Sequence, residues 1–254
     1  LAERADALKR AGRRQAAAEY ARVWDAAVDA LEQCAALLGD MELDAAGFFS
    51  FSVVIVLGYL LGGINGAILL SKLVEKDDVR RHGSGNAGFT NFFRNYGKRT
   101  SLLVILIDAA KAAVSCLLGG WLLGKYGLRT EGMLLGGLAA TLGHDFPAFL
   151  GFRGGKGIVC GFATALVTDW RVGLILLAVF ALVYFLTHYV SLASVLCALG
   201  LFVSFWLFHP GRPFVLILSG CLSALAIFLH RENIGRLVKG RERKTYFFKR
   251  GETK

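Results

Sequence analysis

Three short polar segments of the chain carry residue types that suit a phosphate-binding site. The first segment, residues 80–99, reads RRHGSGNAGFTNFFRNYGKR and lies between two long apolar runs. Glycines at positions 83, 85 and 88 let the backbone approach a ligand closely, and successive N–H groups there can form an anion-binding nest. Arg94 or Arg99 can add a charged fork. The first segment therefore predicts a phosphate or carboxylate site.

The second segment offers a similar cradle at Gly154, Gly155, Lys156 and Gly157. It is not a nucleotide-binding P-loop, because Leu150 stands where that motif has its first glycine and Gly157 stands where it has a magnesium-binding hydroxyl. What remains is a set of flexible backbone N–H donors and one lysine at the start of an expected helix. Such an arrangement can hold a phosphoryl group.

The third segment, residues 230–244, reads HRENIGRLVKGRERK. His230, Asn233 and Arg236 are spaced at i, i+3 and i+6, so they follow one helical stripe and their polar ends can converge on the same pocket as the first two segments. The other cations of this tail are expected to contact lipid headgroups, namely Lys239, Arg241 and Arg243.

Apolar runs of transmembrane length place these segments in a membrane protein. The 254 residues are 55% hydrophobic, with a mean hydropathy of +0.53. We predict an all-α, polytopic integral membrane protein with about seven transmembrane helices. The expected spans are 48–73, 101–126, 132–150, 157–170, 171–189, 191–208 and 212–230. The fourth is barely long enough to cross, and a re-entrant or tilted short helix is the alternative.

Charge assigns a side of the membrane to the polar segments. With seven spans, all three emerge on the side that carries most of the lysines and arginines, so this side is expected to be cytoplasmic. The formal charge of +10 therefore fits contact with an anionic leaflet, and we expect no nucleic acid partner. Inside the second expected span, Asp108 and Lys111 stand at i, i+3. We predict that they pair, either as a support for the site or as a structural ion pair.

Residues 1–47 differ from the rest, with nine acids and six bases. The helical spacing of their apolar residues predicts an extra soluble amphipathic helical segment, separate from a membrane domain at 48–254. Residues 19–48, EYARVWDAAVDALEQCAALLGDMELDAAGF, resemble part of the B subunit of bacterial AddAB nuclease-helicase complexes. That resemblance raises the alternative of a fusion or an assembly artefact, and we assign the segment no catalytic role.

Several catalytic signatures are missing from the chain. It has no HxxxxD pair, no GxSxG nucleophile elbow and no HExxH zinc helix. Its five cysteines show no CxxC spacing, and four of them fall inside apolar runs. We therefore expect no metal, no cofactor and no covalent intermediate.

Together, the three polar segments resemble the motifs of the PlsY family, the membrane acyl-phosphate:glycerol-3-phosphate acyltransferases of bacteria. The matching motifs are GSGNAGFTNFFR, GHDFP with FRGGKG, and HRENIGRLVKGRERK, in the family's order. The resemblance implicates as catalytic Ser84, Arg94, His230 and Asn233. As residues that bind substrate or phosphate it implicates Gly83, Gly85, Asn86, Thr90, Asn91, His144, Gly154, Gly155, Lys156, Gly157, Arg236 and Glu242.

The resemblance implies transfer of a fatty acyl group from acyl phosphate to the sn-1 hydroxyl of glycerol 3-phosphate. The products are 1-acyl-glycerol 3-phosphate, a lysophosphatidate used in phospholipid biosynthesis, and inorganic phosphate. Because an acyl phosphate is already activated, anion binding and orientation of one hydroxyl suffice. We expect a monomer in the bacterial inner (plasma) membrane, in contact with membrane lipids and with its active site facing the cytoplasm. A transporter of phosphorylated metabolites is the competing class.

Roles can be assigned within the implied site. Arg94 and Lys156 are expected to hold the two phosphates, while Ser84, Asn86 and Asn233 orient the attacking hydroxyl and the carbonyl. His230 is the first choice as general base, and a phosphate oxygen of a substrate is the alternative.

Overall fold

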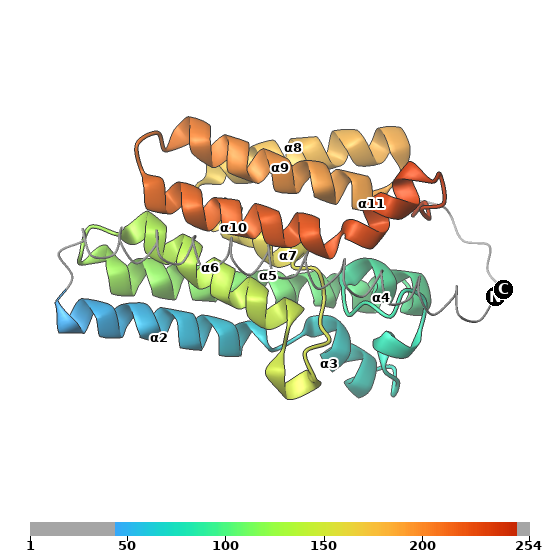
Figure 1. The fold of residues 1–254 in the computed structure, drawn as a ribbon. Coiled ribbons are helices and arrows are strands. Elements are labelled where there is room, and N and C mark those ends of the chain that lie inside the picture. Colours follow the sequence, from blue (N-terminus) through green and yellow to red (C-terminus); the bar gives the residue numbers. More distant parts are fainter. Residues whose placement is uncertain (1–43, 248–254) are drawn as a thin grey trace, which may run out of the picture. The chain divides into compact units, whose positions relative to one another are not determined.

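The computed structural model describes residues 44–247, and every regular element in this part of the chain is a helix (Figure 1). The chain separates into two compact units, Leu1–Asp44 and Ala45–Lys254, and the helices below belong to the second. The soluble helical segment predicted for residues 1–47 lies almost entirely outside the described residues. Its last residues, from Ala45, belong instead to the first apolar helix, α2 (Ala45–Gly62), which therefore begins slightly earlier than predicted.

Five helical segments within residues 44–247 are long and apolar enough to cross a membrane. They are α2 with α3 (Gly66–Leu73), α5 (Lys98–Gly124), α6 (Arg129–Asp145) with the turn η2 (Ala148–Leu150), α8 (Trp170–Thr187) and α9 (Val190–Phe208). A sixth results if α10 (Pro213–Leu229) and α11 (Arg231–Val238), which are bent by 56°, are counted as one span. The predicted all-α membrane fold is thus confirmed for these residues, whereas the count of seven spans is not.

The short helix α7 (Ile158–Thr168) has eleven residues, and part of the depth of the bundle before it is crossed by a non-helical segment. After η2 the chain turns back in an extended segment, residues 153–157, alongside the end of α6. Gly154 N donates to Asp145 O and Gly155 N donates to His144 O, both at 3.1 Å. Consequently α7 starts inside the bundle. Its far end is tied to the residue after α9, because Asp169 Oδ2 lies 3.1 Å from His209 Nε2.

Helices α2, α5 and α6 pack with their backbones in contact at glycines. A Cβ atom added to Gly119 of α5 would lie 1.9 Å from Gly132 O of α6, and one added to Gly62 of α2 would lie 2.1 Å from Ala140 O of α6. Such close approach is how membrane helices gain packing energy when lipid gives no hydrophobic drive for association. These three helices therefore form a tightly packed frame.

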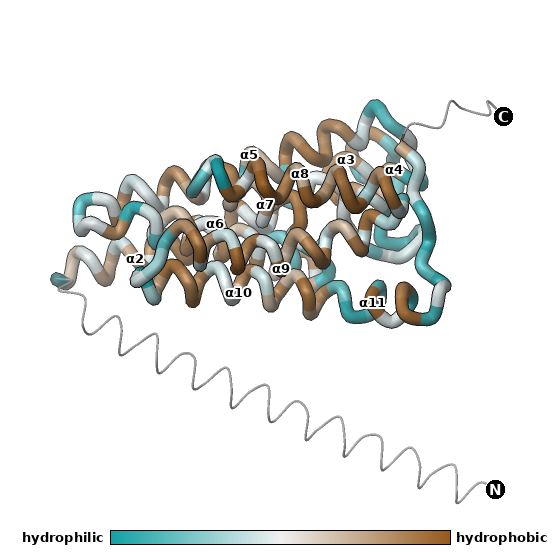
Figure 2. Tube along the Cα trace, turned by 90° about the horizontal axis from the view of Figure 1, so that it is seen from above, coloured by the Kyte–Doolittle hydropathy of each residue, from teal (hydrophilic) through white to brown (hydrophobic). Residues whose placement is uncertain are grey.

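A second group consists of α8, α9 and α10, with α7 packed against both groups (Figure 1). Large apolar side chains such as Trp121, Leu182 and Leu186 are exposed on the outer helix surfaces. Figure 2 shows hydrophilic residues mainly at the ends of the helices and hydrophobic residues along their length. This distribution is what lipid around the middle and water at both ends require.

The end of the bundle that carries α11 also carries η1 (Val79–Arg81) and α4 (Phe89–Tyr96) (Figure 1). Residues 241–247, named here the C-terminal strap, run from α11 across this end. Phe247 packs on Phe93 of α4, with ring centroids 5.1 Å apart, and on Tyr184 of α8, with centroids 4.9 Å apart. Thr245 N donates to His188 O at 2.9 Å. The strap thus joins α4 to α8 over the same end of the bundle where the three polar segments meet.

Candidate active site

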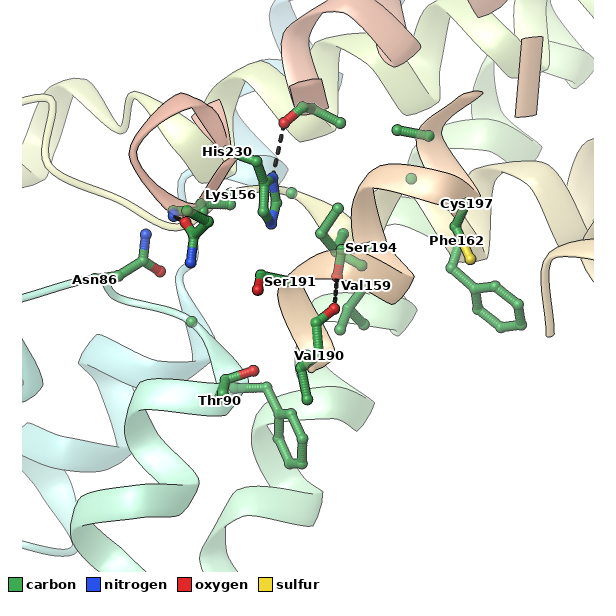
Figure 3. Close-up of a pocket in the computed structure, with 18 of the residues that line it drawn as sticks. Asn86, Thr90, Lys156, Val159, Phe162, Val190, Ser191, Ser194, Cys197 and His230 are labelled. Atoms are coloured by element: carbon green, nitrogen blue, oxygen red, sulfur yellow. Dashed lines mark hydrogen bonds between the residues drawn. The ribbon is translucent and has the colours of Figure 1, made fainter. Parts of the chain in front are cut away.

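A cavity of about 920 Å³ opens at this end of the bundle (Figure 3). Its polar part is lined by loop residues, α4, α11 and the strap, and its apolar part by α7, α8, α9 and α10. Figure 3 shows Asn86, Lys156 and His230 together on one side, with Phe162 and Cys197 on the other. One cavity therefore offers both a cationic and an apolar compartment.

Most of the residues implicated by the sequence line this cavity. Those that do are Gly83, Ser84, Asn86, Thr90, Asn91, Arg94, His144, Lys156, Gly157, His230, Asn233, Arg236 and Glu242. Gly85, Gly154 and Gly155 do not line it. Their place is in the loop backbone, where Gly85 has φ +70 and the other two bond to the end of α6.

The first polar segment is folded around Asn91. Its Oδ1 accepts a hydrogen bond from Ser84 N at 3.0 Å, and its Nδ2 donates to Val79 O at 3.1 Å and to His82 O at 3.0 Å. A Cβ added to Gly83 would lie 2.3 Å from Asn91 Oδ1, so this turn accepts only glycine. Because the side chain of Asn91 is occupied by the loop itself, it holds Ser84 in place and has little capacity left for a ligand.

The second polar segment lies against His144, which is only 4% exposed. A Cβ added to Gly155 would lie 1.9 Å from His144 Nε2. The other ring nitrogen, Nδ1, lies 2.8 Å from Lys111 Nζ. Asp108 Oδ1 lies 2.9 Å from the same ammonium, which confirms the predicted pair. His144 is thus held from both sides beneath the loop, although its ring reaches the cavity wall.

The third polar segment forms α11 with His230 at its N-cap, so the predicted spacing of His230, Asn233 and Arg236 falls on one short helix, which does not continue α10. Helix α10 ends at Leu229, His230 occupies the break, and α11 carries Asn233 and Arg236 at a bend of 56°. All three side chains nevertheless line the cavity. The bend moves α11 across the end of the bundle, which brings its polar residues over the cavity mouth.

His230 follows the last residue of α10 and has one ring nitrogen occupied. Nδ1 lies 2.7 Å from Ala226 O, and because a carbonyl can only accept, Nδ1 carries the proton. Burial, with a smaller contribution from the charge on Lys156, lowers the pKa of His230 to about 4. The imidazole is therefore neutral near pH 7. Its other ring nitrogen faces the cavity in Figure 3 as a hydrogen-bond acceptor.

Lys156 begins a chain of contacts across the cavity mouth. Its Nζ donates to Asn233 Oδ1, Asn233 Nδ2 donates to Glu242 Oε1 at 2.7 Å, and Arg236 Nε donates to Glu242 Oε2 at 2.7 Å. Burial lowers the pKa of the Lys156 ammonium. Burial raises the pKa of Glu242, but hydrogen bonds from Arg236 and Asn233 outweigh it, so the net shift is downward. Asn233 thus positions Lys156 through both ends of its amide.

Arg94 reaches from α4 to the C-terminal strap. Its Nη2 donates to Arg243 O at 3.1 Å and to Thr245 Oγ1. Burial lowers the pKa of its guanidinium. Arg241 and Arg243, which were expected to contact lipid headgroups, also line the cavity. The strap was not predicted, because its placement depends on contacts of Phe247 with Phe89, Phe93 and Tyr184, which are distant from it in the sequence.

The charges lining the cavity are mostly positive. The cations are Arg94, Lys156, Arg236, Arg241 and Arg243, and the acids are Asp108 and Glu242. Since Asp108 is paired with Lys111 and Glu242 with Arg236, the mouth retains an excess of positive charge. Such a mouth attracts phosphorylated ligands and can hold more than one phosphate. Among residues 44–247 no three His, Cys, Asp or Glu side chains form a group that could hold a metal ion.

Comparison with known proteins points in the same direction. The family model described as glycerol-3-phosphate acyltransferase matches residues 52–240. The glycerol-3-phosphate acyltransferase of Thermoanaerobacter pseudethanolicus is 39% identical over 189 residues, covering 74% of this chain and 92% of the relative. That of Finegoldia magna is 38% identical over 199 residues, covering 77% and 98%.

Two crystal structures of PlsY, an integral membrane glycerol 3-phosphate acyltransferase, have the same fold. The glycerol 3-phosphate form superposes with a TM-score of 0.71 at 33% identity, covering 78% of this chain and 96% of PlsY. The lysophosphatidic acid form gives a TM-score of 0.69 at 32% identity, with the same coverage of both chains.

Proposed function

The chain belongs to the glycerol-3-phosphate acyltransferase family, and we propose that it takes its acyl group from an acyl phosphate and delivers it to the sn-1 hydroxyl of glycerol 3-phosphate. The observation that carries the proposal is the continuity of one cavity from a cation-lined mouth to an apolar part between α7 and α10. An acyl phosphate has a charged head and an apolar chain, so it matches both parts at once. A second phosphate beside it accounts for the remaining cations.

The proposed chemistry is direct transfer. The sn-1 oxygen attacks the carbonyl carbon of the acyl phosphate, a C–O ester bond forms, and the C–O bond to phosphate breaks with its electron pair on the departing phosphate. Arg94 of α4 and Lys156 of the second polar segment hold the two phosphates. Ser84 and Asn86 orient the reacting groups. Asn233, occupied by Lys156 and Glu242, is assigned to positioning Lys156.

The pKa of His230 bears on the route of the proton. A base works best when its pKa lies near the working pH. With a pKa of about 4, the imidazole is a weaker base than a phosphate monoester, whose second pKa is about 6. We therefore assign the hydroxyl proton to a phosphate oxygen of a substrate. His230 accepts a hydrogen bond from the hydroxyl and orients it.

The proposal is tested by supplying the purified protein in detergent with radiolabelled glycerol 3-phosphate and either palmitoyl phosphate or palmitoyl coenzyme A. We expect lysophosphatidate from the acyl phosphate alone, with the acyl group on sn-1 by NMR. Product formed from palmitoyl coenzyme A alone would contradict acyl phosphate as the donor. A 2-acyl product would contradict the sn-1 hydroxyl as the acceptor. Uptake of glycerol 3-phosphate into proteoliposomes without any acylation would favour the transporter class.

Gly161 of α7 should set the length of acyl chain that the cavity accepts. It lines the cavity near Phe162, and a Cβ added to it would meet no atom within 4 Å. A leucine there fills free space instead of disturbing packing. We expect Gly161→Leu to lower kcat/KM for palmitoyl phosphate by roughly tenfold or more, since filling or emptying a methylene-sized site changes binding by about that factor. Octanoyl phosphate should be nearly unaffected.

Gly220→Leu is the matched control, because Gly220 of α10 does not line the cavity and faces Phe202. It should leave the ratio of the two kcat/KM values unchanged. Equal losses with both chain lengths in Gly161→Leu would place the acyl chain elsewhere.

We further propose that the protein acts as a monomer in the bacterial plasma membrane with the site at the cytoplasmic face. The end of the bundle with the cavity carries many basic residues, including Lys72, Arg81, Lys98 and Arg99. At the other end, Arg171 and Arg212 are tied up in ion pairs with Asp169 and Glu131. This asymmetry follows the positive-inside rule.

A further inference from the structure

The first span is broken between α2 and α3, at residues 63–65. A break in a membrane helix leaves carbonyl and N–H groups unpaired, and it is tolerated only where protein supplies partners. The partners here come from the buried ion pair of α5. Lys111 Nζ donates to Gly62 O at 2.9 Å and to Ile64 O at 2.8 Å, while Asp108 Oδ1 accepts from Gly66 N at 3.2 Å. The ion pair therefore stabilises the broken backbone.

Asn65, at the break, connects this arrangement to the first polar segment. Its Oδ1 caps α3 by accepting from Ile68 N at 3.0 Å, and its Nδ2 donates to Ala87 O at 3.0 Å. Asn65 is 2% exposed and does not line the cavity. Ala87 N in turn donates to Gly154 O of the second segment at 3.2 Å. Asn65 is thus linked to both loops through Ala87.

Lys111 reaches the second loop by another route. Its Nζ lies 2.8 Å from His144 Nδ1, and an ammonium can only donate, so Nδ1 accepts. His144 O accepts from Gly155 N at 3.1 Å, and the ring packs on Gly155. Asn65 Nδ2 also lies 3.4 Å from His144 Nδ1. Asn65, Asp108, Lys111 and His144, named the break cluster, therefore contact both loops from below.

We infer that the break cluster sets the spacing between the two phosphate-holding loops, and that Asn65 is a positioning residue acting through Ala87. This role rests on the proposed function, in which Ser84 and Lys156, one on each loop, must meet two substrates at a fixed separation. The break in the first span is then not a packing defect. It makes Asn65 the N-cap of a new helix, so that its Oδ1 is held by Ile68 N while its Nδ2 donates to Ala87 O under the loops.

The test uses Asn65→Asp and Asn65→Ser in the full chain. Both keep an oxygen that can cap α3. Aspartate has no donor for Ala87 O, and the serine hydroxyl sits one atom closer to the backbone than the Asn65 amide nitrogen that makes this bond. Asn65→Ser adds no charge to the bundle and serves if the aspartate variant does not fold. We expect kcat to fall about 10²-fold because small misplacements of reacting groups cost that much, with KM for glycerol 3-phosphate changed less than threefold.

Asp169→Asn is the control, because it disrupts a buried polar cluster with Arg171 and His209 at the opposite end. It should lower the thermal midpoint as the Asn65 variants do, without lowering kcat. Hydrogen exchange provides a readout that does not depend on the reaction. Amides of residues 83–88 and 153–157 should exchange about tenfold faster in the Asn65 variants and not in Asp169→Asn.

Unchanged exchange in either loop would overturn the inference, as would kcat values that track only the thermal midpoint across the three variants. If the wild-type protein transfers no acyl group from acyl phosphate, the proposed function fails by itself. The exchange experiment still decides whether Asn65 holds the loops.

Discussion

Replacing Lys156 with methionine should lower kcat by about 10²–10³-fold, the loss typical of removing one charged or hydrogen-bonding group that faces developing charge. Methionine keeps an unbranched chain and removes only the ammonium. The effect is expected to be large because Lys156 is half-buried at the mouth, in a setting less well screened than open water. Its loss also leaves Asn233 without its partner on one side. Steady-state kinetics with both substrates varied measures the change.

The control for this variant is Lys239→Met, which removes the same charge from the same end of the protein at an exposed position outside the cavity. It should change kcat less than threefold. If both lysine variants lose activity equally, the general positive potential of this end is responsible and not Lys156. A Lys156→Met enzyme within tenfold of the wild type would remove Lys156 from the site.

His230→Ala should lower kcat about 10²-fold, because the attacking hydroxyl loses its orienting acceptor. The His230→Gln enzyme should retain most of the wild-type kcat. A glutamine amide can donate to Ala226 O with its NH₂ group and present its oxygen to the cavity, which reproduces the two roles of the imidazole nitrogens. If the imidazole were the base, glutamine could not replace it, and both variants would be impaired by 10²-fold or more.

The pH dependence of the same enzymes separates the two routes again. With a pKa near 4, His230 does not change charge between pH 5 and pH 8, so it contributes no acid limb in that range. Any fall in kcat/KM toward low pH should have its midpoint near the second pKa of a phosphate monoester, about 6. That midpoint should be the same in wild type and His230→Gln. An acid limb lost only in the glutamine enzyme would reinstate His230 as the base.

The local sequence predicted which polar side chains form the site. It did not predict the backbone arrangement that positions them. The glycines, Lys156 and Arg94 could be predicted because a phosphate site needs flexible N–H donors and fixed cations near one another. The pairing of Asp108 with Lys111 followed from their spacing on a helix, and it is confirmed at 2.9 Å. What that pair does could not be predicted, because its partners Gly62 and Ile64 lie in another span.

The breaks in the helices escaped prediction for a physical reason. Residues 48–73 and 212–230 are predominantly apolar, and a hydropathy profile reports the length of an apolar run but not the direction of the helix axis. The break at 63–65 is held by α5, and the bend at His230 accompanies a strap that packs through Phe247. Both depend on contacts distant in the sequence. The place of Arg241 and Arg243 in the cavity wall could not be predicted for the same reason.

The glycine contacts among α2, α5 and α6 have a consequence for how such an enzyme can diverge. A methyl group at Gly62, Gly119 or Gly132 would run into backbone atoms at 1.9–2.2 Å, so almost no substitution is tolerated on that side. On the side of α7 to α10, by contrast, Gly161 faces open space and the cavity wall is made of replaceable apolar side chains. Mutations on this side can therefore change which acyl chains the cavity accepts without changing how the phosphate group is bound. Enzymes of organisms with different fatty acids can therefore keep the same polar site residues and differ only in the apolar side chains of α7 to α10.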